Sequence, residues 1–169
     1  LSPYGYTKLT NESQFYVSSI KNAVCVRFFT VYGPYGRPDM ALFTFTKNII
    51  NDEPIIVYNN GDMKRDFTYV DDIVQGLWLI SQNMTSRDLY CLGNGTQVNL
   101  MDFIHEIEKN LGKTAKKDFQ PMHPADALET WSDTSKIQKL GYKSSTPIAV
   151  GIRNFVQWYK NNYKGKTAL

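Results

Sequence analysis

The stretch "AVCVRFFTVYG", residues 23–33, predicts the central strand of this chain. Its β-branched and aromatic residues form one continuous apolar run, which is typical of a strand covered on both faces. Gly33 closes the run, and the turn-rich segment "GPYGRPD" follows at residues 33–39. A buried strand of this kind requires helices to cover it, so the sequence on either side decides the fold class.

Helix-like and strand-like segments alternate on both sides of this strand. Residues 4–22 precede it and carry apolar side chains at helical spacing. The later segments predict helices at residues 41–52, 71–83, 99–111, 133–142 and 148–163, and strands at residues 54–58, 65–70 and 88–95. Asp71 or Asp72 is expected to cap the start of one helix, and Gly112 the end of another. The alternation predicts an α/β protein.

The composition excludes several classes of partner. The 169 residues are 42% hydrophobic, enough for a domain core, and 19 Lys and Arg against 16 Asp and Glu give a net charge of +3. Because these charges are spread along the chain, no nucleic-acid partner is indicated. No apolar run reaches the roughly 20 residues of a membrane span, and no signal peptide is recognisable. Cys25 and Cys91 lie in apolar segments as expected for reduced, buried thiols, so a cytoplasmic protein is predicted.

Tyr4 and Lys8 stand four residues apart at the start of the first predicted helix, so their side chains share a face. A free phenol has a pKa of about 10 and is a poor base near neutral pH. A neighbouring ammonium favours the phenolate, which makes the tyrosine a workable general acid–base, whereas Tyr6 faces elsewhere. The pair alone leaves a second interpretation open, in which Tyr4 packs and Lys8 is solvated.

Four motifs give this pair a context. They are "SPYGYTK" at residues 2–8, "VRFFTVYGPYGRPDMALF" at 26–43, "KRDFTYVDDIVQG" at 64–76 and "HPADALETWSDTSKIQKLGY" at 123–142. In this order they resemble the extended short-chain dehydrogenase/reductase family, specifically its nucleotide-sugar 4-epimerases and most of all the UDP-glucuronate 4-epimerases.

The resemblance implies the C-terminal half of a Rossmann-type doubly wound sheet together with the smaller α/β substrate-binding domain. Residues 1–36 would be a remnant of the NAD-binding domain, and residues 37–169 would be mainly the UDP-sugar-binding domain. Residues 66–92 would return to the Rossmann sheet. The glycine-rich turn for the NAD pyrophosphate would lie in a missing N-terminal half, so a C-terminal fragment is expected.

The sequence itself contains one candidate for a phosphate-binding turn. The segment "GNGTQV" at residues 93–98 follows a strand, but it lacks a third glycine and an acidic residue about twenty positions further on. A tight turn is the better interpretation of these residues.

The resemblance also implies the residues of the site. Tyr4 and Lys8 would be catalytic and, with Val31, would contact NAD. The UDP-sugar contacts would be Thr30, Arg37, Leu42, Tyr58, Arg65 and Asp126. No metal is implied, and the two histidines, His105 and His123, lack cysteines at zinc-ligand spacing.

Each of these positions has a role and an alternative. A guanidinium holds a carboxylate through two parallel hydrogen bonds, and the resemblance implies that Arg37 reads the C6 carboxylate of a uronic acid. It further implies that Thr30 touches the sugar and Tyr58 stacks on uracil. The alternatives are a solvated Arg37, a threonine bonded to backbone, and an aromatic residue at a sheet edge.

Two further positions concern the nucleotide. The resemblance assigns Arg65 to the diphosphate and Asp126 to the ribose hydroxyls, and the alternative for Arg65 is an ion pair with Asp66 or Asp72. His123 stands where relatives usually carry arginine or glutamine, which puts the phosphate contact at that position in doubt.

The reaction that the resemblance implies is inversion at C4 of a UDP-hexuronic acid, UDP-glucuronate to UDP-galacturonate, by transient oxidation with bound NAD. A UDP-glucose 4-epimerase or a decarboxylating relative is the alternative within the enzyme class. A nucleotide-sugar-binding module without turnover is the alternative outside it. The full-length protein is expected to be a homodimer that pairs through the first helix, and the isolated chain is expected to be inactive.

Overall fold

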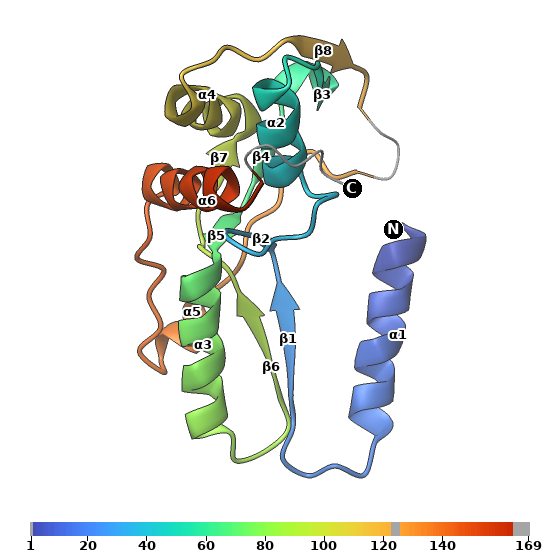
Figure 1. The fold of residues 1–169 in the computed structure, drawn as a ribbon. Coiled ribbons are helices and arrows are strands. Elements are labelled where there is room, and N and C mark those ends of the chain that lie inside the picture. The colour runs from blue at the N-terminus through green and yellow to red at the C-terminus, as the bar shows by residue number, and fades with distance from the viewer. Residues whose placement is uncertain (1, 123–125, 164–169) are drawn as a thin grey trace.

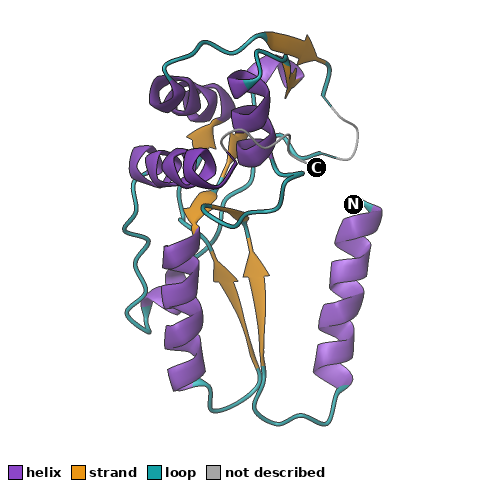
Figure 2. Cartoon of the chain, viewed as in Figure 1, coloured by secondary structure: helices purple, strands orange, loops and turns teal. Residues whose placement is uncertain are grey.

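The computed structural model describes residues 2–122 and 126–163 and has the α/β architecture that the alternation predicts (Figures 1 and 2). Its elements, in chain order, are α1 (Pro3–Val17), β1 (Val24–Phe28), β2 (Thr30–Tyr32), α2 (Ala41–Ile50), β3 (Ile55–Tyr58), the 3-10 helix η1 (Asn59–Gly61), β4 (Lys64–Arg65), β5 (Phe67–Tyr69), α3 (Val70–Asn83), β6 (Asp88–Leu92), β7 (Val98–Asn99), α4 (Leu100–Leu111), β8 (Lys117–Gln120), α5 (Ser135–Gln138) and α6 (Ile148–Tyr163).

The strands pair in twos, and most pairs are parallel. Strand β1 pairs with β6, β2 with β5 and β3 with β8, all parallel, whereas β4 and β7 form a short antiparallel pair. Helix α3 connects β5 to β6, so the chain crosses over between strands through a helix, as parallel pairing requires. In Figure 1 the pair β1–β6 lies between α3 and α1. The helices α2, α4 and α6 gather at the top of this view, beyond β2 and β5.

Two predicted strands are each broken in the structure. The stretch 23–33 forms β1 and β2 with a break at Phe29, and Phe28 is 50% exposed instead of buried. After the break the Thr30 amide donates to the Asp66 carbonyl at 3.0 Å, so the chain changes its pairing partner from β6 to β5. The segment 65–70 is likewise divided into β4 and β5 at Asp66. Strand β8 was not predicted, because its "KDFQ" lacks an apolar alternation.

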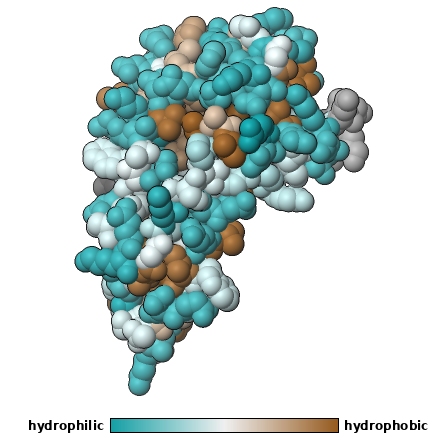
Figure 3. Space-filling model, turned by 90° about the vertical axis from the view of Figure 1, so that its left-hand side faces the viewer, coloured by the Kyte–Doolittle hydropathy of each residue, from teal (hydrophilic) through white to brown (hydrophobic). Residues whose placement is uncertain are grey.

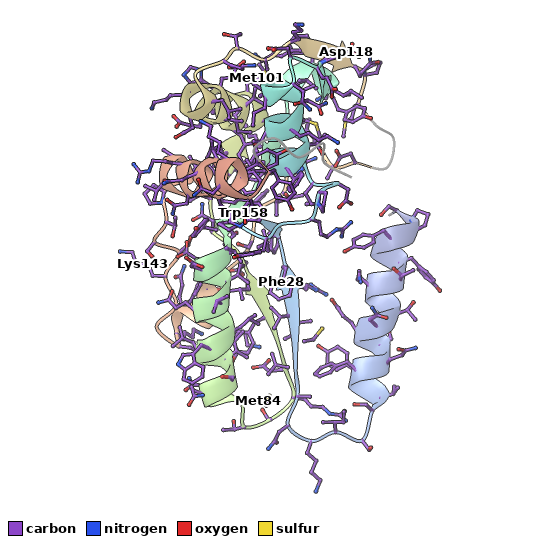
Figure 4. The ribbon with its side chains drawn as sticks, viewed as in Figure 1. Phe28, Met84, Met101, Asp118, Lys143 and Trp158 are labelled. Atoms are coloured by element: carbon purple, nitrogen blue, oxygen red, sulfur yellow. The ribbon has the colours of Figure 1, made fainter. Side chains whose placement is uncertain are left out.

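Helix α1 is shorter than the predicted helix 4–22. It ends at Val17 because Ser18 is extended, with its amide donating back to the carbonyls of Gln14 and Phe15. The Arg87 guanidinium closes this end by donating to the carbonyls of Tyr16 at 2.7 Å and Ile20 at 2.6 Å. No residue of α1 is buried, and its side chains project to all sides (Figure 4).

The start of α3 also differs from the prediction. Tyr69 precedes the helix as its cap residue without a side-chain bond, and Asp71 and Asp72 lie inside the first turn. The buried Asp72 carboxylate instead accepts hydrogen bonds from the Ser144 hydroxyl and the Thr146 amide, both at 3.1 Å. It therefore anchors a distant loop, which sequence spacing could not reveal. Gly112 does end α4 in the left-handed conformation, with φ of 67°, as predicted.

The buried side chains form two clusters. The larger one lies between α2, α4 and α6 and the strands β3 and β5, and the smaller one joins α3, β6 and α5. On the face formed by the helical end and α3, hydrophobic areas are separated by hydrophilic surface (Figure 3). Within the described ranges, every helix falls short of the length and hydrophobicity of a membrane span.

Gly151 on α6 packs closely against Tyr32 of the larger cluster, and this close packing yields a first prediction. A Cβ at this position would lie 2.3 Å from the Tyr32 hydroxyl, and the Tyr32 ring is held edge-on by Phe67 and Phe103. Because this ring cannot move aside, we expect Gly151→Ala to lower the free energy of unfolding by about 1–3 kcal/mol despite the better helix propensity of alanine. The exposed Gln157→Ala on the same helix is the control, expected within about 0.5 kcal/mol of wild type in urea unfolding. Equal midpoints for both variants would contradict this reading of the contact.

Candidate functional site

The Tyr4–Lys8 pair lies on the first two turns of α1. Ser2 caps the helix by accepting a hydrogen bond from the Gly5 amide at 3.1 Å, and Pro3 occupies the first turn, where its missing amide hydrogen costs nothing. The Lys8 ammonium nitrogen lies 5.3 Å from the centroid of the Tyr4 ring. The two side chains therefore share a face, as the spacing predicts. Tyr4 is 71% exposed, so its hydroxyl is open to a ligand.

A cavity opens at the carboxyl end of β2, beside the loop that follows. Its volume is about 50 Å³, it is partly open to solvent, and four of the predicted ligand contacts line it. These are Thr30, Val31, Arg37 and Leu42. Ligands of α/β proteins bind at the carboxyl ends of parallel strands, and this cavity has that position. Its wall also includes residues for which the sequence gave no site prediction, among them Tyr32, Met40, Phe67 and Phe155.

Arg37 stands on the exposed loop at the rim of this cavity. Its guanidinium makes two parallel hydrogen bonds to Asp39, from Nε to Oδ1 at 3.0 Å and from Nη2 to Oδ2 at 2.5 Å. The hydrogen bond to the Asp39 carboxylate, together with the negative charge of that carboxylate, raises the pKa of Arg37.

Arg65 and Asp126 are brought together, and the structure does not support the alternative in which Arg65 pairs with Asp66 or Asp72. The Arg65 guanidinium pairs with the Asp126 carboxylate at 2.7 Å, not with Asp66 or Asp72. It also donates to the carbonyls of Ala127 and Leu128, so one half-buried arginine binds three successive residues, 126–128. The two residues predicted to contact the diphosphate and the ribose thus lie side by side, and neither is among the residues that line the cavity with Arg37.

The Asp66 carboxylate joins segments that lie far apart in the sequence, and sequence reasoning did not predict this role. Its carboxylate is fully buried and accepts five hydrogen bonds, and within residues 2–122 and 126–163 it has no cationic partner. The donors are the Thr68 hydroxyl, the amides of Asn94 and Gly95, and the amide and hydroxyl of Ser132. Residues 93–97 form a bend between β6 and β7, in which Gly95 has a positive φ of 76°, and Val98 already belongs to β7. The amides of Asn94 and Gly95 hold the internal carboxylate.

Tyr142 supports the same turn. Burial, together with the charges of Asp72 and Asp66, raises the pKa of Tyr142 to about 12. The hydroxyl therefore keeps its proton at neutral pH and donates to the Gly93 carbonyl at 2.8 Å. This hydrogen bond fixes Tyr142, which follows Asp126 in the chain, to the residue directly after β6.

The remaining predicted positions lie elsewhere or are not described. Tyr58 ends β3 opposite Gln120 of β8 and is 39% exposed, outside the residues that line the cavity. His123 lies outside the described residues. In the part of the chain that the structure describes, no cluster of three or more His, Cys, Asp or Glu side chains could hold a metal ion. Cys25 and Cys91 are free and half-buried.

Parallel strand pairs joined through a helix, with an exposed tyrosine–lysine pair on the helix before the first strand, define a Rossmann-like α/β protein of the short-chain dehydrogenase type. A sequence profile described as the NAD dependent epimerase/dehydratase family matches residues 1–93. The chain belongs to this family.

Relatives of known activity and structure refine the comparison. The UDP-glucuronate 4-epimerase of Thermodesulfobacterium geofontis is 38% identical over 168 residues, which are 96% of this chain and 51% of that protein. The crystal structure of UDP-glucuronic acid 4-epimerase from Bacillus cereus, in complex with UDP-glucuronic acid and NAD, superposes with a TM-score of 0.90 at 34% identity. The match covers 96% of this chain and 54% of that one. The chain thus spans about half the length of the relatives that it matches.

A more distant structure shares the fold alone. UDP-glucose 4-epimerase from Thermotoga maritima, solved with UDP-glucose, superposes with a TM-score of 0.87 at 21% identity. The match covers 97% of this chain and 55% of that protein. The architecture is therefore common to epimerases of different substrates, and substrate choice must be argued from individual residues.

Proposed function

We propose that this chain is the substrate-binding half of an NAD-dependent UDP-hexuronate 4-epimerase, which converts UDP-glucuronate to UDP-galacturonate. The observation that carries the proposal is the cavity at the end of β2, which Arg37 lines together with Thr30 and Leu42. An arginine at the rim supplies the donor pair that a uronate carboxylate needs, and the tyrosine supplies a proton acceptor for a sugar hydroxyl. We call this chain, joined to the N-terminal half that its relatives carry, the complete enzyme.

The residues of this chain carry the proton transfers. Tyr4, as phenolate, takes the proton of the C4 hydroxyl while hydride leaves C4, and a 4-keto sugar results. Lys8 stabilises the phenolate through its positive charge. After the keto sugar has turned its other face, hydride returns to C4 and Tyr4 gives the proton back to the oxygen. The configuration at C4 is thereby inverted, with no net oxidation.

The exposed residues fit one end of NAD. The Tyr4 hydroxyl, the Lys8 ammonium and the apolar Val31 leave hydrogen-bonding and apolar surface open for the nicotinamide and its ribose. Bound NAD supplies a reversible hydride acceptor. The described residues offer no comparable cradle for the pyrophosphate, because the amides of Asn94 and Gly95 are bonded to the Asp66 carboxylate.

The clamp on the carboxylate also guards the product. The keto form of a uronic acid is a β-keto acid and loses CO₂ readily. Two hydrogen bonds from Arg37 would keep the carboxylate ionised and in the plane of the guanidinium, which restrains its loss. This role favours an epimerase over a decarboxylating relative.

Domain division and assembly belong to the same proposal. Residues 1–36 and 66–92 would complete the NAD-binding sheet. The rest of residues 37–169 would bind the UDP-sugar through Arg37, Leu42, Tyr58, Arg65 and Asp126, and Thr30 of the first segment would also contact it. The unburied α1, with exposed Leu9, Tyr16 and Val17, supports a homodimer that pairs through this helix. The cytoplasmic location stays a prediction from composition.

Substrate competition in the complete enzyme tests the proposal. We expect UDP-glucuronate to be converted to UDP-galacturonate in preference to UDP-glucose, with no release of CO₂. Arg37→Gln should lower turnover of UDP-glucuronate by about 10- to 100-fold, because a charge-assisted pair of hydrogen bonds is lost, and should leave turnover of UDP-glucose largely unchanged. Preferential turnover of UDP-glucose by the wild-type enzyme would refute the substrate assignment.

The isolated chain provides a second test. Without a pyrophosphate cradle, the 169-residue chain is expected to be inactive and to bind NAD poorly. Calorimetric titration with NAD should therefore show no binding in the micromolar range. Micromolar binding by this chain alone would contradict the need for an N-terminal half.

A further inference from the structure

The loop at the rim of the cavity contains an internal carboxylate that already occupies the guanidinium of Arg37. The Met40 amide donates to the Arg37 carbonyl at 3.1 Å, which closes a four-residue turn with Pro38 in its second position. The proline ring fixes one backbone angle of this turn in advance. Asp39, in the third position, is therefore held beside the arginine, and its two carboxylate oxygens accept from Nε at 3.0 Å and Nη2 at 2.5 Å.

This geometry is the one by which Arg37 would hold a ligand carboxylate. Two parallel hydrogen bonds from one edge of the guanidinium use both donors of that edge, so Asp39 and a uronate cannot be bound there together. The Arg37 and Asp39 side chains are 75% and 63% exposed, so separating them disturbs no core packing. Exposed ion pairs are weak, which makes exchange of one carboxylate for another accessible.

The position of the pair gives the exchange a functional consequence. Arg37 lines the cavity together with Thr30, Val31 and Leu42, whereas Asp39 is not among the lining residues. The carboxylate that leaves would turn toward solvent, and the one that arrives would come from the cavity side. Asp39 would nevertheless stay close enough to repel the bound carboxylate, since both carry a negative charge.

We propose that Asp39 is a resident carboxylate of the Arg37 site, which a uronate displaces and a neutral hexose leaves in place. The inference rests on the proposed function and adds a residue that determines specificity. With Asp39 paired, the rim of the cavity is electrically balanced and accepts a neutral sugar without leaving a bare guanidinium. A uronate that takes this same edge of the guanidinium must first break the internal pair, so Asp39 weakens uronate binding and narrows the preference for UDP-glucuronate over UDP-glucose.

Binding measurements on Asp39→Asn in the complete enzyme test the proposal. By calorimetry, we expect UDP-glucuronate to bind about two- to fivefold more tightly than to wild type, as loss of an exposed competing pair allows. Binding of UDP-glucose should change by less than about 1.5-fold on the same grounds. Glu53→Gln removes the same charge at an exposed position between α2 and β3 and should change neither affinity. In an Arg37→Gln background, the effect of Asp39→Asn on UDP-glucuronate should disappear.

The outcomes separate this inference from the proposed function. If Arg37→Gln leaves uronate binding unchanged, Arg37 does not hold the carboxylate, and both the proposed function and the role of Asp39 fail. If Arg37→Gln weakens uronate binding but Asp39→Asn weakens it as well or leaves it unchanged, only the displacement is overturned. An equal gain for UDP-glucose, or for Glu53→Gln, would reduce the effect to general electrostatics and also overturn it.

Discussion

Replacing Tyr4 by phenylalanine is expected to lower the rate of epimerisation by the complete enzyme by about 10²- to 10⁴-fold, the range of general acid–base catalysis. The ring and its contact with Lys8 would remain, and only the hydroxyl that exchanges a proton with the sugar would be lost. Substrate affinity should change little, so the loss should appear in kcat and not in the dissociation constant of UDP-glucuronate. The measurement is conversion of UDP-glucuronate to UDP-galacturonate, followed beside calorimetric binding.

Tyr6 offers a matched control for this experiment. It lies two residues along the same helix and is exposed to a similar extent, 67% against 71% for Tyr4. Residues two apart do not share a helix face, so Tyr6 is not aligned with Lys8. Tyr6→Phe should therefore retain activity within about twofold of wild type, since it removes no group that exchanges the proton. Full activity in Tyr4→Phe, or an equal loss in Tyr6→Phe, would rule out Tyr4 as the acid–base.

Asp66→Ala is expected to destabilise the chain by about 3–5 kcal/mol, the cost of leaving buried hydrogen-bond donors without their charged acceptor. All five donors would lose this acceptor at once, and within the described residues only the Gly95 amide also donates elsewhere, to the Ser132 hydroxyl at 3.1 Å. One of the segments affected is the strand β5, whose Phe67 lines the cavity. Since whole domains are stable by only about 5–15 kcal/mol, a change of this size can unfold the protein. Urea unfolding followed by tryptophan fluorescence measures it.

Two further variants make the Asp66 prediction specific. Asp66→Asn keeps one acceptor oxygen but turns an NH₂ group toward donors, so it should be destabilising by a smaller amount. Asp71→Ala, at an exposed acid in the first turn of α3, should cost less than about 1 kcal/mol, the value of a favourable charge at a helix start. If Asp66→Ala unfolds at the same urea concentration as Asp71→Ala, the buried hydrogen bonds of Asp66 do not provide the predicted stability.

The sequence was informative wherever a feature depends on neighbouring residues. The spacing of Tyr4 and Lys8 predicted a shared helix face, and the structure confirms it with a distance of 5.3 Å. Gly112 marked the end of α4 because a left-handed backbone favours glycine, and it adopts a φ of 67°. The alternation of apolar segments indicated the α/β class, and four ordered motifs indicated the family.

Predictions failed where the deciding contact comes from a distant part of the chain. The first helix ends earlier than predicted, at a point where the Arg87 guanidinium donates to the Tyr16 carbonyl. The predicted strand 23–33 divides where the Thr30 amide donates to the Asp66 carbonyl. The alternative for Arg65 was an ion pair with Asp66 or Asp72, yet its acidic partner is Asp126, 61 positions away. Local periodicity contains no information about such partners.

By itself the sequence determined the α/β class, the order of most helices and strands, and the helix face that joins tyrosine to lysine, because backbone propensity and side-chain spacing act over a few residues. Only the tertiary structure decided where the strands break, which donors surround the Asp66 carboxylate, and that Arg37 lies at a cavity rim already paired with Asp39. These features follow from burial and from the need of every buried polar group for a partner, which the folded chain meets with residues far apart in sequence.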